Sequence, residues 1–178
     1  KVLDGRLRGI LPSKMMVLLR PEGTRPNNTK RWHKSRHLDH LLQVEKGMQD
    51  DNDRLGRYVT KTTVGLCISG GGAYGFAGIG VISAMLELGI PIDGLGGASA
   101  GAMIAALYAY NDDYEEMLAM MKKLLFRQNI YGFLDGTNPN ILAMTKGRYY
   151  RKAIKHVFGD ISIEDLLVPC LFLSANVT

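Results

Sequence analysis

Hydrophobic and polar positions follow one another in blocks that predict a strand, a glycine loop and a helix in the middle of the chain. The run TTVGLCIS at 62–69 is β-branched and apolar, which is typical of a short strand buried on both faces. It leads directly into GGGAYG. Apolar residues then recur at helical spacing until Gly89, a predicted C-terminal cap. The members of this stripe are Phe76, Ile79, Ile82, Met85 and Leu86.

The same pattern repeats in the next block. IPIDGLGGAS predicts a second strand that ends at Ser99, and AGAMIAALYAY predicts a helix rich in small residues. A βαβα series predicts a parallel sheet with right-handed crossovers. A further helix is expected over 113–126, capped by Asn111 or Asp112, with acidic residues first and basic ones near its end. Its apolar stripe would form either core or a surface for an acyl chain. The stripe comprises Tyr114, Met117, Leu118, Met121, Leu124 and Leu125.

The flanking segments are predicted with less regular patterns. A strand is expected at 15–19, a helix or strand at 37–44, and a helix near 51–58. GRYYRKAIKHVF predicts a basic amphipathic helix, and VPCLFLSANVT predicts a final strand. We therefore expect one α/β domain over 59–178, preceded by a basic arm, 1–58, that holds one strand and connecting segments.

Composition supports a globular chain: 46% of the 178 residues are hydrophobic and 22% are charged. No run reaches the roughly 18 unbroken apolar residues of a membrane span, and the start KVLDGRLRGI has no signal-peptide pattern. We expect a soluble chain that is cut from something longer. Cys67 and Cys170 lie in apolar runs, so buried thiols in a reducing compartment are expected rather than a disulfide framework. No metal site is expected, because the sequence contains no CxxC pair and no carboxylate cluster with the spacing of metal ligands.

Positive charge is concentrated near the N-terminus. Residues 1–40 hold 10 Lys and Arg against 3 Asp and Glu, whereas the remainder holds 12 against 14. In TKRWHKSRH at 29–37, Trp32 stands among basic residues that could meet the phosphates of a membrane surface or of nucleic acid. The alternative is a solvated connecting arm. These basic residues are Lys30, Arg31, Lys34 and Arg36.

Candidate chemistry centres on Ser99, which stands between Gly97 and Gly101 in a GxSxG pattern. A nucleophile elbow needs a strand, a sharp glycine-containing turn and a helix that begins under the serine, and IDGLGGASAGAMIAALY supplies all of them. Gly70, Gly71 and Gly72 offer backbone amides for an oxyanion, and parallel strands would bring both loops to one sheet edge.

Other interpretations of the same residues remain open. The glycine run could be a plain strand-to-helix turn. Gly70, Gly72 and Gly75 also spell GxGxxG with Asp93 downstream, but a ribose-binding acid belongs at the end of the second strand, so dinucleotide binding fits poorly.

A base for Ser99 is harder to find. His156 is the only histidine after Ser99, and a Ser99, Asp135, His156 triad has a suitable chain order but lacks the intervening strands. We interpret His156 as a surface residue and Asp135 as a turn residue.

These motifs together resemble the patatin-like phospholipases. SGGGAYGFAGIGVISAMLELGIPID followed by GGASAGAMIAALYA is similar to that family's glycine-rich oxyanion loop and GxSxG elbow. MMVLLRPEGTRPNNTKRW and the last 34 residues, from TKGRYY onward, resemble the neuropathy target esterase branch. The resemblance implies an α/β three-layer sandwich with a mainly parallel central sheet, of which residues 59–178 would be the N-terminal part.

The resemblance also implies roles for individual residues. Ser99 would be the nucleophile of a Ser-Asp dyad without histidine, with Gly70, Gly71 and Gly72 as the oxyanion hole. Gly97 and Gly101 would be the elbow glycines, and Gly75 would close the loop. The family's aspartate lies in a DGG or DGA motif downstream of SANVT, so it is expected beyond Thr178, and this chain alone is expected to be inactive. Tyr74 stands where the family usually has Arg or Lys.

The function that follows is a serine esterase acting on phospholipids or lysophospholipids through an acyl-enzyme, without metal or organic cofactor. The resemblance further implies an intracellular protein, peripherally associated with a membrane, with cyclic-nucleotide-binding-like domains upstream. The alternative is a catalytically silent module that binds lipid or a partner, for which Tyr74 and the absent aspartate argue. Nucleic-acid binding through 29–37 is a third, disfavoured hypothesis.

Overall fold

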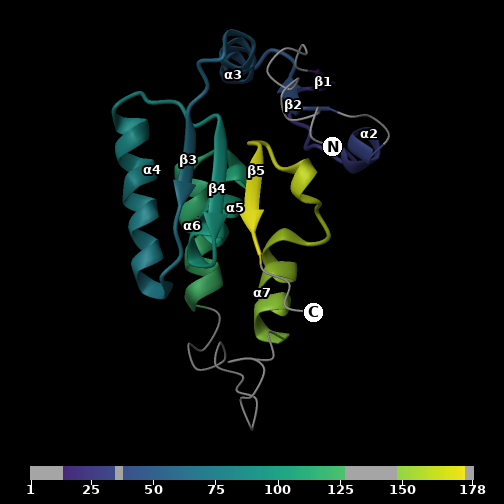
Figure 1. Cartoon of the computed structure of the whole chain (residues 1–178). Helices are drawn as coiled ribbons and strands as arrows, with labels where there is room; N and C mark the ends of the chain where they lie inside the picture. The colour runs from purple at the N-terminus through teal and green to yellow at the C-terminus, as the bar shows by residue number, and fades with distance from the viewer. Residues whose placement is uncertain (1–13, 35–37, 127–147, 175–178) are drawn as a thin grey trace, which may run out of the picture. The chain divides into compact units, whose positions relative to one another are not determined.

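The computed structural model describes residues 14–34, 38–126 and 148–174 (Figure 1). The chain divides into two compact units, Lys1–Thr63 and Val64–Thr178. None of the described helices is long and apolar enough to cross a lipid bilayer.

The first unit contains a parallel pair of strands. Its elements are β1 (Met15–Arg20), α2 (Lys30–Lys34), β2 (His40–Glu45) and α3 (Gln49–Thr60). The two strands pair from Met15 opposite His40 to Arg20 opposite Glu45. The segment at 37–44, for which the sequence left helix and strand open, therefore contributes a strand.

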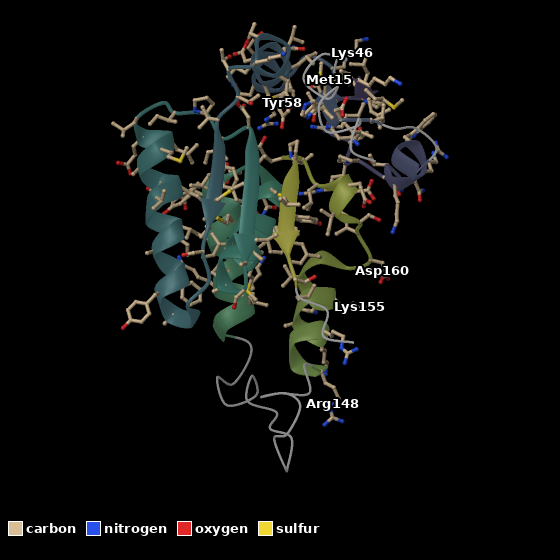
Figure 2. All side chains as sticks on the ribbon, in the orientation of Figure 1. Met15, Lys46, Tyr58, Arg148, Lys155 and Asp160 are labelled. Atoms are coloured by element: carbon tan, nitrogen blue, oxygen red, sulfur yellow. The ribbon has the colours of Figure 1, made fainter. Side chains whose placement is uncertain are left out.

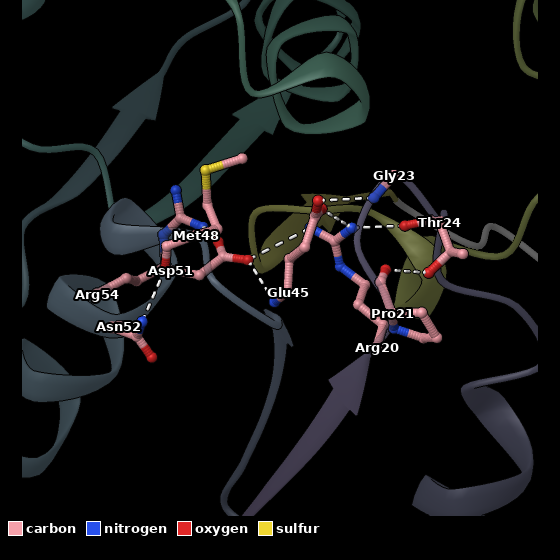
Figure 3. Close-up of polar contacts among 9 residues, drawn as sticks. All are labelled: Arg20, Pro21, Gly23, Thr24, Glu45, Met48, Asp51, Asn52 and Arg54. Carbon is pink, nitrogen blue, oxygen red and sulfur yellow. Dashed lines mark hydrogen bonds and ion pairs between the residues drawn. The ribbon is translucent and has the colours of Figure 1, made fainter.

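Charged side chains gather where these two strands end (Figure 3). Arg20 pairs with Glu45 and, at 3.3 Å, with Asp51 of α3, whose other oxygen lies 3.0 Å from Arg54. The backbone N–H of Gly23 donates to Glu45 Oε1 at 2.8 Å and, together with Arg20, holds the pKa of Glu45 below its ordinary value. These side chains are largely buried, so each charge needs the partners that the network supplies.

The second unit is built on a parallel sheet, as predicted. Its strands β3 (Gly65–Ile68), β4 (Gly94–Ala98) and β5 (Cys170–Leu173) lie in the order β3-β4-β5. The connections include η1 (Gly72–Phe76), α4 (Ala77–Glu87), α5 (Ala100–Asn111), α6 (Tyr114–Phe126), α7 (Arg148–Phe158) and η3 (Ile163–Asp165). The α/β class and the alternation of strand and helix are thereby confirmed.

Helix α5 packs against all three strands of this sheet and forms the centre of the core with α6. Met117, Met121 and Leu124 of α6 are buried, so the apolar stripe of this helix is core rather than an acyl-chain surface. The predicted N-terminal cap of α6, Asn111 or Asp112, was wrong by one or two positions. Asp113 caps α6, because its Oδ1 accepts from the backbone N–H of Glu116 at 2.8 Å, whereas Asp112 ends α5 in a left-handed conformation.

The other face of the sheet is open among the described residues. Leu171 and Leu173 are 68% and 70% exposed, and Cys67 of β3 is exposed too. The expectation of a strand buried on both faces is therefore wrong for Cys67, because the described helices cover one face only. Cys170 points to the covered side, where burial raises the pKa of its thiol to about 12.

Asp93 aligns the beginnings of β3 and β4. It is completely buried, its Oδ2 accepts from the N–H of Val64 at 2.9 Å, and its own N–H donates to the Val64 carbonyl at 2.9 Å. The parallel register continues from Gly65 opposite Gly94 to Ile68 opposite Gly97. β3 consequently ends one residue before β4, and GGGAYG and Ser99 follow at the same edge of the sheet.

Candidate active site

Ser99 occupies a strained turn between β4 and α5. Its backbone has φ 52° and ψ −123°, a region that residues with a β-carbon rarely enter and that costs on the order of 1–3 kcal/mol. Serine is a favourable helix cap, yet this hydroxyl makes no capping hydrogen bond to α5. The residue is exposed. A serine held in this way is available to react with a ligand.

The glycines on either side of Ser99 let the strand and the helices pass closely. A β-carbon added at Gly97 would lie 2.6 Å from Cα of Ala102, and one added at Gly101 would lie 2.2 Å from the carbonyl oxygen of Ile68. Neither position has room for a side chain. The turn therefore depends on glycine at both positions of the GxSxG pattern.

The structure brings the glycine-rich loop to the same turn. A β-carbon at Gly70 would lie 2.9 Å from Cβ of Ser99, and one at Gly75 would lie 2.7 Å from Cβ of Ala100. Gly71 and Gly72 have φ of 128° and 59°, which favour glycine. The loop thus places peptide groups without side chains beside Ser99.

Tyr74 belongs to the same loop but points outward. Its side chain is 89% exposed. The aromatic ring, at the position where the resemblance predicts Arg or Lys, is therefore not packed against the described residues around Ser99. Because the ring is in solvent, a guanidinium at this position would meet no steric obstacle.

An apolar cavity of about 340 Å³ opens at Ser99. Its walls come from α5, from α7, from the segment that follows α7 and from β5, and they include Met103, Ile154, Phe158 and Phe172. Apart from Ser99, the one hydroxyl among the lining residues is that of Ser162. Such a chamber suits a hydrocarbon chain whose polar end remains near Ser99.

Sequence patterns did not indicate the cavity wall formed by α7 and the residues after it. The available signal was the amphipathic pattern of the predicted basic helix, whose apolar side had to face something. The residues that this apolar side contacts depend on the path of the connection from α6 to β5. A local sequence pattern does not specify that path.

The remaining candidates lie elsewhere or outside the described residues. His156 is exposed on α7, as expected of a surface residue. Asp135 lies outside the described residues. Asp93 is at the amino ends of β3 and β4, opposite the end that carries the glycine loop, which argues against dinucleotide binding. Among the residues described, no group of three or more His, Cys, Asp or Glu side chains is arranged to hold a metal ion.

Comparison with known proteins adds an independent observation. Residues 66–178, which contain the glycine loop, Ser99 and the cavity wall, match the family described as Patatin-like phospholipase. The chain belongs to this family. The predicted resemblance to its neuropathy target esterase branch is confirmed as well, by similarity to proteins named Neuropathy target esterase sws.

Two of these relatives, both from fruit flies, show the extent of the similarity. The protein of Drosophila mojavensis is 34% identical over 93% of this chain and 13% of its own length. That of Drosophila melanogaster is 37% identical over 78% of this chain and 10% of its own length. The chain thus spans about an eighth of the length of the curated relatives it matches. No solved structure gives a significant match to it.

Proposed function

We propose that the second unit carries the nucleophile of a serine esterase that hydrolyses acyl esters of phospholipids or lysophospholipids. The observation that carries the proposal is the placement of Ser99. Ser99 is exposed and stands on a strained strand-to-helix turn, beside three consecutive glycines and at an apolar cavity. Membership of the patatin-like phospholipase family supports the same chemistry.

In the proposed reaction, Ser99 Oγ attacks the ester carbonyl carbon and its proton passes to a base. Backbone N–H groups of Gly70, Gly71 and Gly72 would stabilise the oxyanion, and one such donor is typically worth about 3 kcal/mol in the transition state. Collapse breaks the bond to the alcohol, which leaves as it takes up the proton. Water then hydrolyses the acyl-enzyme, releases the fatty acid and restores the serine.

The base in this proposal is the aspartate of a Ser-Asp dyad, carried over from the family's DGG or DGA motif beyond SANVT. Among the described residues that line the cavity at Ser99, none is acidic or a histidine, and His156 is a surface residue of α7. We also propose, on the family resemblance, peripheral association with an intracellular membrane and cyclic-nucleotide-binding-like domains upstream in the full-length protein.

The proposal is tested by intact-mass detection of a fluorophosphonate adduct. The measurement compares this chain with a longer version extended through the next DGG or DGA, each beside its Ser99→Ala variant. One Ser99-dependent adduct on the longer protein supports the esterase, and its absence from the short one places the base beyond Thr178. If neither folded protein reacts, the esterase proposal fails.

A second candidate is a catalytically silent module that binds lipid, and the exposed Tyr74 favours it. Without a cation in the glycine loop, charge stabilisation of an oxyanion would be weaker. Tyr74→Arg in the longer version separates the two candidates. If Ser99 is already competent, the rate of adduct formation changes only modestly, whereas inactivity of both proteins favours the silent module.

A further inference from the structure

Helix α7 forms one wall of the cavity at Ser99 and at the same time presents a basic surface. Ile154 and Phe158 line the cavity. Arg151 stands three residues before Ile154, and Lys155 stands three residues before Phe158. Residues three and four apart share a helix face, so the two cations stand in the same stripe as the two lining residues.

The basic residues of this helix reach solvent. Arg151, Lys152 and Lys155 are exposed. In Figure 2, Arg148 and Lys155 lie on the side of α7 that faces away from the sheet. The helix contains no acidic residue. Its outer side is therefore a local concentration of positive charge next to the cavity.

Acidic side chains near this surface do not cancel its charge. Lys155 Nζ lies 3.2 Å from Asp160 Oδ1, with side chains that are 70% and 86% exposed. An ion pair so exposed contributes little and exchanges readily with other partners. In η3, Glu164 is half-buried and Asp165 is buried, so most of the exposed charge of this region is that of the α7 cations.

Apolar side chains are exposed among these charges. Ile154 is 44% exposed and Ile163 is 53% exposed, although both line the cavity. The opening is thus edged by isoleucines in solvent, with cations beside them. This combination is typical of surfaces that lie in the interfacial layer of a bilayer, where apolar groups enter the acyl boundary and basic ones meet phosphates.

We propose that the outer face of α7, with Arg151, Lys152, Lys155, Ile154 and Ile163, docks on an anionic phospholipid bilayer. The inference rests on the proposed function, because docking would set the cavity against the source of its acyl chains. A bilayer fits better than nucleic acid, since phosphates of a nucleic acid would engage the cations and leave both isoleucines in water.

Vesicle flotation of the full 178-residue chain tests this docking surface. The protein carries Ser99→Ala, so binding is measured without turnover, and the vesicles contain phosphatidylcholine with or without phosphatidylserine. Each Lys or Arg near an anionic surface strengthens binding about fivefold. R151Q/K155Q removes two of them and should weaken binding to the anionic vesicles roughly 30-fold. The charge-conserving pair R151K/K155R should bind like the parent.

Matched variants distinguish α7 from the rest of the chain. K46Q/K61Q removes the same charge from two exposed lysines of the first unit and should have little effect. K30Q/R31Q tests the basic arm. The proposal is overturned if the loss of vesicle binding is confined to K30Q/R31Q, or if all three charge-removing pairs lose binding equally. It is also overturned if the protein binds neutral vesicles equally well or binds nucleic acid in preference to vesicles. Fluorophosphonate reactivity of the longer version, with Ser99 intact, reports separately on the esterase.

Discussion

Gly101, in the first turn of α5, lies so close to Ile68 at the end of β3 that an added β-carbon would be 2.2 Å from the Ile68 carbonyl oxygen. The obstacle is backbone, which cannot rotate away as a side chain can. The helix under Ser99 therefore rests directly on the neighbouring strand, and the glycine loop that leaves this strand comes within reach of the serine.

Gly101→Ala should consequently destabilise the second unit by about 3 kcal/mol, as overpacking against a fixed backbone does. Gly80→Ala in α4 is the matched control, because an added β-carbon there meets nothing within 4 Å. Alanine is the better helix former, so the control should gain about 0.5–1 kcal/mol. Urea unfolding measures the free energy of unfolding of both variants. Similar values would show that small structural shifts relieve the close approach at Gly101 with little loss of stability.

Replacing Ser99 separates stability from reactivity. Ser99→Gly removes the β-carbon from a position with φ 52° and should stabilise the protein by about 1 kcal/mol relative to Ser99→Ala, after the entropic cost of glycine is subtracted. Neither variant should form a fluorophosphonate adduct. Thermal unfolding gives the comparison, and a less stable glycine variant would contradict the proposed strain.

The two cysteines should differ sharply in reactivity. Cys67 is exposed, whereas burial raises the pKa of Cys170 to about 12, so Cys170 has very little thiolate near neutral pH. Iodoacetamide should add one group to the native protein, none to native Cys67→Ser, and two to the unfolded chain. Mass spectrometry counts the adducts. Alkylation of Cys170 before Cys67 would contradict the burial pattern.

Acid should weaken the first unit through Glu45. The pKa of this carboxyl is held below its ordinary value of 4.5 by the Gly23 N–H and by Arg20. A lowered folded pKa stabilises the folded state fully above the unfolded value, and this contribution is lost as pH falls through the folded pKa. Glu45→Gln removes the titrating group. Its unfolding free energy should depend less steeply on pH below 4.5 than that of the parent, and parallel profiles would refute the assignment.

Much of the second unit could be predicted because its elements have simple periods. The strands that end at Ile68 and Ala98 and the helices that follow them are set by local residue types, and the glycine spacing indicated the turn at Ser99. The exposure of Cys67 could not be predicted, since it depends on which face other elements cover. The cavity wall from Ile154 onward was missed for a similar reason: it arises from contacts between segments far apart in sequence.

The hydrogen bonds of Asp93 have a consequence at the opposite end of the sheet. Asp93 and Val64 are 29 residues apart, and so are Ser99 and Gly70, because the parallel register is continuous between the two pairs. A slip of one residue would move the glycine loop along the strand by roughly 3.3 Å. Deleting a single residue from either strand would therefore dismantle the site while leaving all its residues in the chain. The fixed register between the two strands is a requirement of the chemistry as much as of the fold.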